Sequence, residues 1–199
     1  MGRLADPQLA DRRRRQIMDA ALACFSRRGF HQATMQEICA EAGISAGALY
    51  RYFDSKAEII SAIAEANRGE GHSAFLQAAE QQGLMGALCV AARDFFDKLN
   101  QGHSALIADV IAESIRDEGL ARSLRANDAS SVALFAEAIR RAQARDEIDA
   151  TLDPEKAAST LHAVIEGIRL RRALLRDTDP HDALRQFREI AERYLSPRT

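Results

Sequence analysis

The 199-residue sequence has few of the features that mark secreted, zinc-stabilised or membrane proteins. Its three cysteines are widely spaced and form no CxxC pair, which argues against a structural zinc site and against a disulfide framework. The longest nearly apolar stretch, residues 83–92, is far too short to cross a bilayer. Near the N-terminus, Arg12–Arg15 and Asp19 interrupt every apolar stretch that could form the core of a signal peptide. We therefore expect a soluble, cytoplasmic protein with no membrane partner.

Residues that favour β-strands are also scarce. Valine occurs 4 times, against 38 alanines and 24 arginines, and both of these residues favour helices. Apolar residues recur at helical spacing, no segment alternates as a strand would, and all four prolines lie at segment edges. The pattern predicts an all-α protein with about nine helices. The expected helices span residues 10–28, 34–42, 46–52, 55–78, 84–99, 103–117, 120–145, 155–176 and 180–195.

Residues 34–58 carry the densest local signals in the chain. Thr34–Glu37 and Ser55–Glu58 both have the pattern of a capping box, in which a hydroxyl group and a glutamate close the first turn of a helix. Gly43 lies where a helix end needs a left-handed residue, and Ser45 can cap the helix that follows. Two short helices joined by a glycine turn predict a helix-turn-helix.

The surface of the second short helix suits a DNA major groove. Its first residues, 46–48, are alanine and glycine, so its N-terminus can approach another surface closely. Tyrosine, arginine and lysine side chains follow between residues 50 and 56. Residues 1–56 carry nine basic and six acidic side chains, a net +3, whereas residues 57–199 carry eighteen and twenty-three, a net −5. This asymmetry suits an anionic partner at the N-terminal part, although +3 over 56 residues is equally ordinary surface variation.

These residues resemble the DNA-binding signature of the TetR/AcrR family of bacterial transcriptional regulators. The resemblance rests on Thr34, Ile38 and the string Ala42–Lys56, and upstream on Arg15–Ala21, Phe25 and Gly29–Phe30. It implies a three-helix DNA-binding head and a larger helical body that binds a small molecule and dimerises through its last two helices. The chain accordingly divides into a flexible tail (1–10), a helix-turn-helix DNA-binding domain (11–56) and an effector-binding and dimerisation domain (57–199).

The resemblance also implies roles for individual residues. The residues expected to hold DNA phosphates are Thr34, Ser45, Tyr50, Tyr52 and Lys56. Those expected nearest the base edges are Gln36, Ala46, Gly47 and Arg51. Some family members have a polar reader where this chain has Ala46, whose methyl group can only touch a thymine methyl or read shape. Hydrogen-bonded specificity is therefore expected from Gln36 or Arg51. At least one arginine of Arg12–Arg15 is also expected to contact DNA.

The body of the chain carries weaker signals. Candidate effector-binding residues are Phe95, Phe96, His103, Glu113, Phe135 and His162, although the spacing of the aromatic residues is equally that of a plain core. His162 and Glu166 are one helical turn apart and are expected to pair. No histidines have the spacing of metal ligands, so neither a metal nor a cofactor is expected. Segments 155–176 and 180–195 each carry an apolar stripe, which favours a homodimer through a four-helix bundle.

Together these features predict a ligand-responsive transcriptional regulator. We expect a repressor that binds a near-palindromic operator as a homodimer and is released by a small-molecule effector. Two alternatives stay open from the residues alone. The first is an interaction protein whose helix-turn-helix is a packing motif, and the second is a small helical enzyme, although the sequence contains no catalytic motif. Salt dependence separates the first alternative from DNA binding, because DNA binding must weaken steeply as salt rises.

Overall fold

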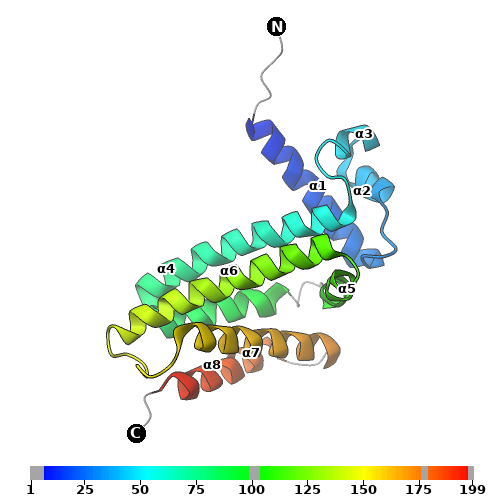
Figure 1. The fold of residues 1–199 in the computed structure, drawn as a ribbon. Helices are drawn as coiled ribbons and strands as arrows, with labels where there is room; N and C mark the ends of the chain where they lie inside the picture. Colours follow the sequence, from blue (N-terminus) through cyan, green and yellow to red (C-terminus); the bar gives the residue numbers. More distant parts are fainter. Residues whose placement is uncertain (1–6, 99–103, 176–178, 197–199) are drawn as a thin grey trace. The chain divides into compact units, whose positions relative to one another are not determined.

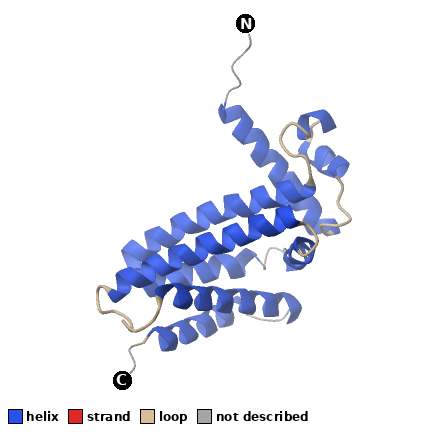
Figure 2. Ribbon diagram, viewed as in Figure 1, coloured by secondary structure: helices blue, strands red, loops and turns tan. Residues whose placement is uncertain are grey.

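A computed structural model describes residues 7–98, 104–175 and 179–196. In these ranges the chain forms eight α-helices (Figure 1), and Figure 2 shows helices and loops without a strand, which confirms the all-α prediction. The helices are α1 (Pro7–Arg28), α2 (Met35–Ala42), α3 (Ala46–Leu49), α4 (Lys56–Lys98), α5 (Ser104–Ser114), α6 (Glu118–Gln143), α7 (Pro154–Leu175) and α8 (Pro180–Leu195). None of the helices described is long and apolar enough to cross a membrane.

α4 consists of two helical segments that meet at Gly83, in agreement with the prediction of separate helices over 55–78 and 84–99. The first segment extends to residue 82 instead of residue 78. Gly83 has φ 71° and ψ −172°, which is not helical, so the chain kinks at this residue. Only glycine adopts this backbone conformation readily. The helical spacing of apolar residues therefore breaks at Gly83 for a real structural reason.

Two other boundaries differ from the sequence-based expectation. α3 ends at Leu49 instead of residue 52, because the next residues form a turn in which the N–H groups of Tyr52 and Phe53 donate to the Leu49 carbonyl at 2.9 and 3.1 Å. α1 already begins at Pro7, inside the segment expected to be a tail.

The chain divides into two compact units. The first, here called the head unit, contains residues 1–66 and 105–124, and the second, the body unit, contains residues 67–104 and 125–199. The sequence placed the functional boundary after residue 56 and assigned everything beyond it to the body. By packing, α5 and the start of α6 belong to the head unit, because their apolar side chains are part of its core. The residues that they contribute to this core are Leu106, Val110 and Leu120.

The head unit is built on apolar faces of its first four helices. Ile17, Phe25, Ile38, Leu49 and Ile59 are almost completely buried in one cluster. Cys24 and Cys39 belong to the same cluster and act as small core residues. This packing fixes the short helices α2 and α3 against α1, because neither is long enough to be stable alone.

The body unit contains most of α4 and α6 together with α7 and α8. Phe75 of α4 stacks on Phe135 of α6 with ring centroids 5.1 Å apart, so these two helices share one apolar core. α7 and α8 lie side by side and run in opposite directions (Figure 1). Caps at both starts agree with the sequence pattern: Asp153 accepts from the Lys156 N–H at 2.9 Å, and Asp179 accepts from the His181 N–H at 2.9 Å.

Candidate nucleic-acid interface

The helix-turn-helix is defined by caps at each of its ends. Thr34 Oγ1 accepts from the Glu37 N–H at 3.2 Å and the Glu37 carboxylate accepts from the Thr34 N–H at 2.9 Å, so the predicted capping box is present. Gly43 ends α2 with φ 62°, the left-handed conformation expected from the sequence. Ser45 then caps α3 by accepting from the Ala48 N–H at 3.2 Å. Local sequence therefore determines the geometry of this motif.

The second capping box, at the start of α4, differs in one partner. Ser55 Oγ accepts from the Glu58 N–H at 3.1 Å, as expected. The Glu58 carboxylate reaches one residue further back and accepts from the Asp54 N–H at 2.7 Å. α4 is thus fixed to the turn that follows α3.

Most residues expected to contact DNA are exposed on α2, α3 and the turn after α3. The exposed ones are Thr34, Gln36, Ser45, Ala46, Gly47, Tyr50 and Arg51. An added Cβ at Gly47 would meet nothing within 4 Å, which shows that the front of α3 is open. Tyr52 and Lys56 differ from the others because both are half-buried, and Tyr52 packs against the head core.

Two polar side chains of α1 hold the motif in place. Gln16 Nε2 donates to the Ala42 carbonyl at the end of α2 at 2.6 Å. Arg14 donates to the Tyr52 carbonyl at 3.3 Å, and its guanidinium lies 4.4 Å from the centre of the Phe53 ring. Sequence reasoning missed this structural role of Arg14, because Arg14 is one of four successive arginines and nothing in the sequence distinguishes it from the other three. Arg12 and Arg15 are the two of the four that are fully exposed.

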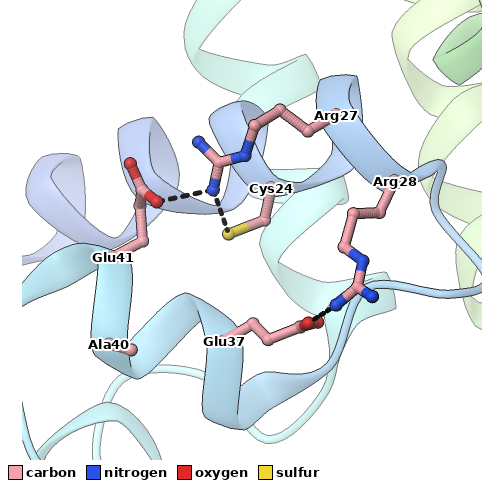
Figure 3. A pocket seen from close by; sticks show the side chains of 6 residues that line it. All are labelled: Cys24, Arg27, Arg28, Glu37, Ala40 and Glu41. Carbon is pink, nitrogen blue, oxygen red and sulfur yellow. Dashed lines mark hydrogen bonds and ion pairs between the residues drawn. The ribbon is translucent and has the colours of Figure 1, made fainter.

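A pocket of about 450 Å³ lies between α1 and α2. Figure 3 shows the side chains that line it. Arg27 pairs with Glu41 at 2.6 Å, and Arg28 pairs with Glu37, so that two ion pairs join the helices across this pocket. The hydrogen bond from Arg27 lowers the pKa of the Glu41 carboxyl. Burial raises the pKa of the Cys24 thiol at the pocket floor, which keeps it protonated and a poor nucleophile. The charged side chains that line this pocket are therefore paired with one another across α1 and α2.

The structure brings together three of the six candidate effector-binding residues. His162 of α7 lies between two phenylalanine rings, with centroids 5.8 Å from Phe95 and 5.9 Å from Phe135. His162 Nδ1 is 3.0 Å from an Asp128 carboxylate oxygen. The expected pair with Glu166 does not form, because Glu166 pairs with Arg169 on the same helix. The two histidine contacts tie α4, α6 and α7 together inside the body unit.

The other three candidates lie elsewhere. Phe96 is buried beside the cluster, where it accepts a hydrogen bond through its carbonyl from Arg172 at 3.3 Å. Glu113 belongs to the head unit, 3.6 Å from His31 Nδ1. His103 lies outside the described residues.

Two arginines of α7 were missed by the sequence reasoning. The guanidinium of Arg169 lies 5.3 Å from the centre of the Phe95 ring, and that of Arg172 lies 5.6 Å from the centre of the Phe96 ring. Arg169 Nε is buried and has no hydrogen-bond partner among the described residues. A signal existed for Arg172, because it continues the helical stripe of Leu161, Ile165 and Ile168.

Comparison with known proteins gives matches to both parts of the chain. The family model "Bacterial regulatory proteins, tetR family" matches residues 17–63, and the model "BetI-type transcriptional repressor, C-terminal" matches residues 85–196. The transcriptional regulator UidR of Escherichia coli (strain K12) is 27% identical over 177 residues, which cover 87% of this chain and 85% of UidR.

Solved structures agree with these matches. Salmonella enterica GusR has a TM-score of 0.76 at 27% identity, over 98% of this chain and 99% of GusR. FadR of Bacillus subtilis, solved in complex with stearoyl-CoA, has a TM-score of 0.76 at 19% identity, over 89% of this chain and 96% of FadR.

Proposed function

Because the chain belongs to the TetR family of bacterial regulatory proteins, we propose that it is a ligand-responsive repressor that binds a near-palindromic operator as a homodimer. Members of this family are DNA-binding transcriptional regulators, and this chain is one of them. The observation that carries the finer proposal is the exposed set of polar and small residues on α2, α3 and the following turn. The protein would act in the cytoplasm, where it occludes a promoter until an effector releases it.

In the proposed complex the exposed residues and the half-buried Tyr52 divide the recognition of DNA between them. Thr34, Ser45, Tyr50 and Tyr52 bind phosphates by hydrogen bonds and fix the register of the head on the duplex. Gln36 and Arg51 read base edges in the major groove, since a planar guanidinium or amide can make two hydrogen bonds to one base. Ala46 and Gly47 allow close approach and contribute shape but no hydrogen bond. Lys56 has a different role, which is argued in the next subsection.

The salt dependence of binding tests this proposal against a helix-turn-helix that only packs. With Arg12 and Arg15 of each head on phosphates, four counterions are released per dimer, and log K falls with log[salt] with a slope of about −3.6. A fourfold rise in salt should then weaken binding to a selected operator about a hundredfold. We expect this in an anisotropy titration at several salt concentrations. A flat profile, or no site selected from a random DNA pool, would contradict DNA recognition and favour the packing alternative.

The effector is proposed to bind in the body unit at the cluster of His162, Phe95 and Arg169. The two aromatic rings favour an aromatic compound of modest size. The unpaired Nε of Arg169 provides a donor for a carbonyl or carboxylate of that compound. FadR supports a small-molecule ligand in this fold, since its structure contains stearoyl-CoA.

Thermodynamic linkage gives a test of effector release. An effector that lowers operator affinity must bind more weakly to the operator-bound protein by the same factor, about 5–150-fold. Titration of a candidate effector by calorimetry, with and without operator DNA, measures this factor. His162→Phe keeps an aromatic ring in the cluster and removes the polar ring nitrogens, so it should weaken effector binding and leave operator affinity unchanged. Equal effector affinities with and without DNA would rule out the coupling.

Homodimer formation is proposed to use α7 and α8. Residues 163, 167, 170 and 174 lie on one exposed stripe of α7, and all are alanine, glycine or leucine. Ile190 of α8 is also exposed. Exposed leucines in such a row are unusual on a monomer and are typical of an interface.

A further inference from the structure

The backbone of Phe30, in the turn between α1 and α2, is held at both of its hydrogen-bonding groups. Its N–H donates to Asp109 Oδ2 of α5 at 2.9 Å. Its carbonyl accepts from Lys56 Nζ, the first residue of α4, at 2.6 Å, and Lys56 also donates to the His31 carbonyl at 3.0 Å. These residues all belong to the head unit. One peptide segment thus connects the helix-turn-helix to both α4 and α5.

Side-chain packing shows that this arrangement is fixed. The Phe30 ring is 3% exposed and lies 5.2 Å from the Phe25 ring, and the Lys56 ammonium lies 4.9 Å from its centre. Gly29 has φ 78°, and an added Cβ there would stand 3.0 Å from Asp109 Oδ2. The Asp109 carboxylate therefore occupies the place where a side chain at residue 29 would project.

Lys56 is poorly placed to bind a phosphate. Two of its three N–H donors are already used by the carbonyls of Phe30 and His31. Burial lowers the pKa of the Lys56 ammonium, and the charge of Glu113 on α5 acts in the opposite direction. A rearrangement toward DNA would leave two carbonyls without their donor and would separate the cation from the Phe30 ring. The cation is therefore satisfied inside the head.

We propose that Lys56 and Asp109 are a pair of positioning residues that clamp the Phe30 backbone from α4 and α5, and that Lys56 is not a phosphate ligand. The clamp sets the orientation of α2 and α3 for operator reading, and through Asp109 it joins α5 by a hydrogen bond to the turn before α2. This inference rests on the proposed DNA-binding surface. It adds Asp109, a residue that does not contact DNA, to the residues on which operator binding depends.

A double-mutant cycle on the full chain tests the clamp. Lys56→Met keeps the apolar stem, and Asp109→Ala removes the acceptor. Each should lower affinity for a selected operator by about tenfold to a hundredfold, with an unchanged salt slope. The double variant should lose little more than either single variant, because both act on the same peptide. Asp109→Asn keeps an oxygen for the Phe30 N–H and should retain most of the affinity.

A second measurement needs no DNA. Hydrogen exchange of the Phe30 amide, followed by NMR, should become at least about tenfold faster in Lys56→Met, because loss of the carbonyl anchor loosens the whole turn. Loss of a surface phosphate ligand would leave this amide unchanged. The unfolding free energy of each variant is measured in parallel, and binding is compared only where the protein is fully folded.

The opposite results overturn the inference. If Lys56 binds a phosphate, Lys56→Met lowers the salt slope by about 0.9 per protomer and weakens binding to random-sequence DNA as much as binding to the operator. The losses of binding free energy in Lys56→Met and Asp109→Ala are then additive in the double variant. Arg51→Ala separates this outcome from failure of the DNA-binding surface. It should weaken operator binding and leave the hydrogen exchange of the Phe30 amide unchanged, and an Arg51→Ala protein with unchanged affinity would contradict the surface and not the clamp.

Discussion

Replacement of Gly167 with arginine is expected to convert the protein from a dimer to a monomer and to lower its operator affinity by about 10²–10⁴-fold, the factor that linking two binding sites normally provides. Gly167 lies in the middle of the exposed stripe of α7. Leu170 and Leu174, on the same stripe, are 54% and 79% exposed, which leaves a large apolar area facing solvent in a single chain. Two copies of this face would bury both leucines.

Glycine at the centre of the stripe lets two helices approach closely, because interaxial distance depends on side-chain size at the contact. Gly167 is exposed and an added Cβ there meets nothing within 4 Å inside the chain, so we expect an arginine side chain to extend into solvent in the monomer. The substitution therefore acts on the interface and not on the fold.

Sedimentation and operator binding measured on the same samples check this prediction. Gly69→Arg is the matched control, since Gly69 is also an exposed glycine inside a helix with nothing within 4 Å of an added Cβ. The control should remain dimeric and bind normally. A Gly167→Arg protein that sediments as a dimer would show that α7 does not form the interface through this stripe.

The second large effect is expected from Arg51→Ala. Arg51 is exposed in the turn directly after α3, where it projects from the motif that Ser45, Gly43 and the α4 cap hold in place. Loss of one base contact costs about 1–3 kcal/mol, and a symmetric dimer loses it twice, so affinity should fall by about 30-fold or more. Preference at one base pair of each half-site should relax at the same time.

Arg141→Ala in α6 is the control for charge, because Arg141 is an exposed arginine of the body unit that pairs with Glu137 at 2.9 Å. It removes the same charge and should leave operator affinity almost unchanged. Selection from a random DNA pool with each variant gives the base preferences. If Arg51→Ala weakens all sequences equally and keeps its preferences, Arg51 contacts phosphate and Gln36 is left as the hydrogen-bonding reader.

The parts of the site that the sequence predicted well are those made by neighbouring residues. The Thr34 and Ser45 caps and the left-handed Gly43 depend on bonds that span three or four residues, so the pattern of residue types determines them. The bond between Phe30 and Asp109 joins residues that are 79 positions apart. No local rule brings these two together, and only the packing of α5 into the head core does.

The same distinction explains why contacts of long side chains were not foreseen. His162 and Glu166 have helical spacing that allows a pair, but His162 contacts Asp128 of another helix and Glu166 pairs with Arg169 of its own helix. The prediction that Lys56 binds phosphate came from its place in the motif, and its carbonyl partners in the α1–α2 turn cannot be inferred from spacing. Long flexible side chains have several partners within reach, and tertiary contacts decide between them.

The open front of α3 also bears on how such a regulator can change its target. Ala46 and Gly47 fill no pocket and make no hydrogen bond through a side chain, so a longer polar residue at position 46 adds a contact without removing one. A single substitution can then create a new operator preference while the caps, the core and the proposed phosphate contacts stay intact. A family member with this surface is therefore a favourable starting point for evolving or engineering new specificity. A base-contacting side chain can be added at position 46 without removing a hydrogen bond that is already there.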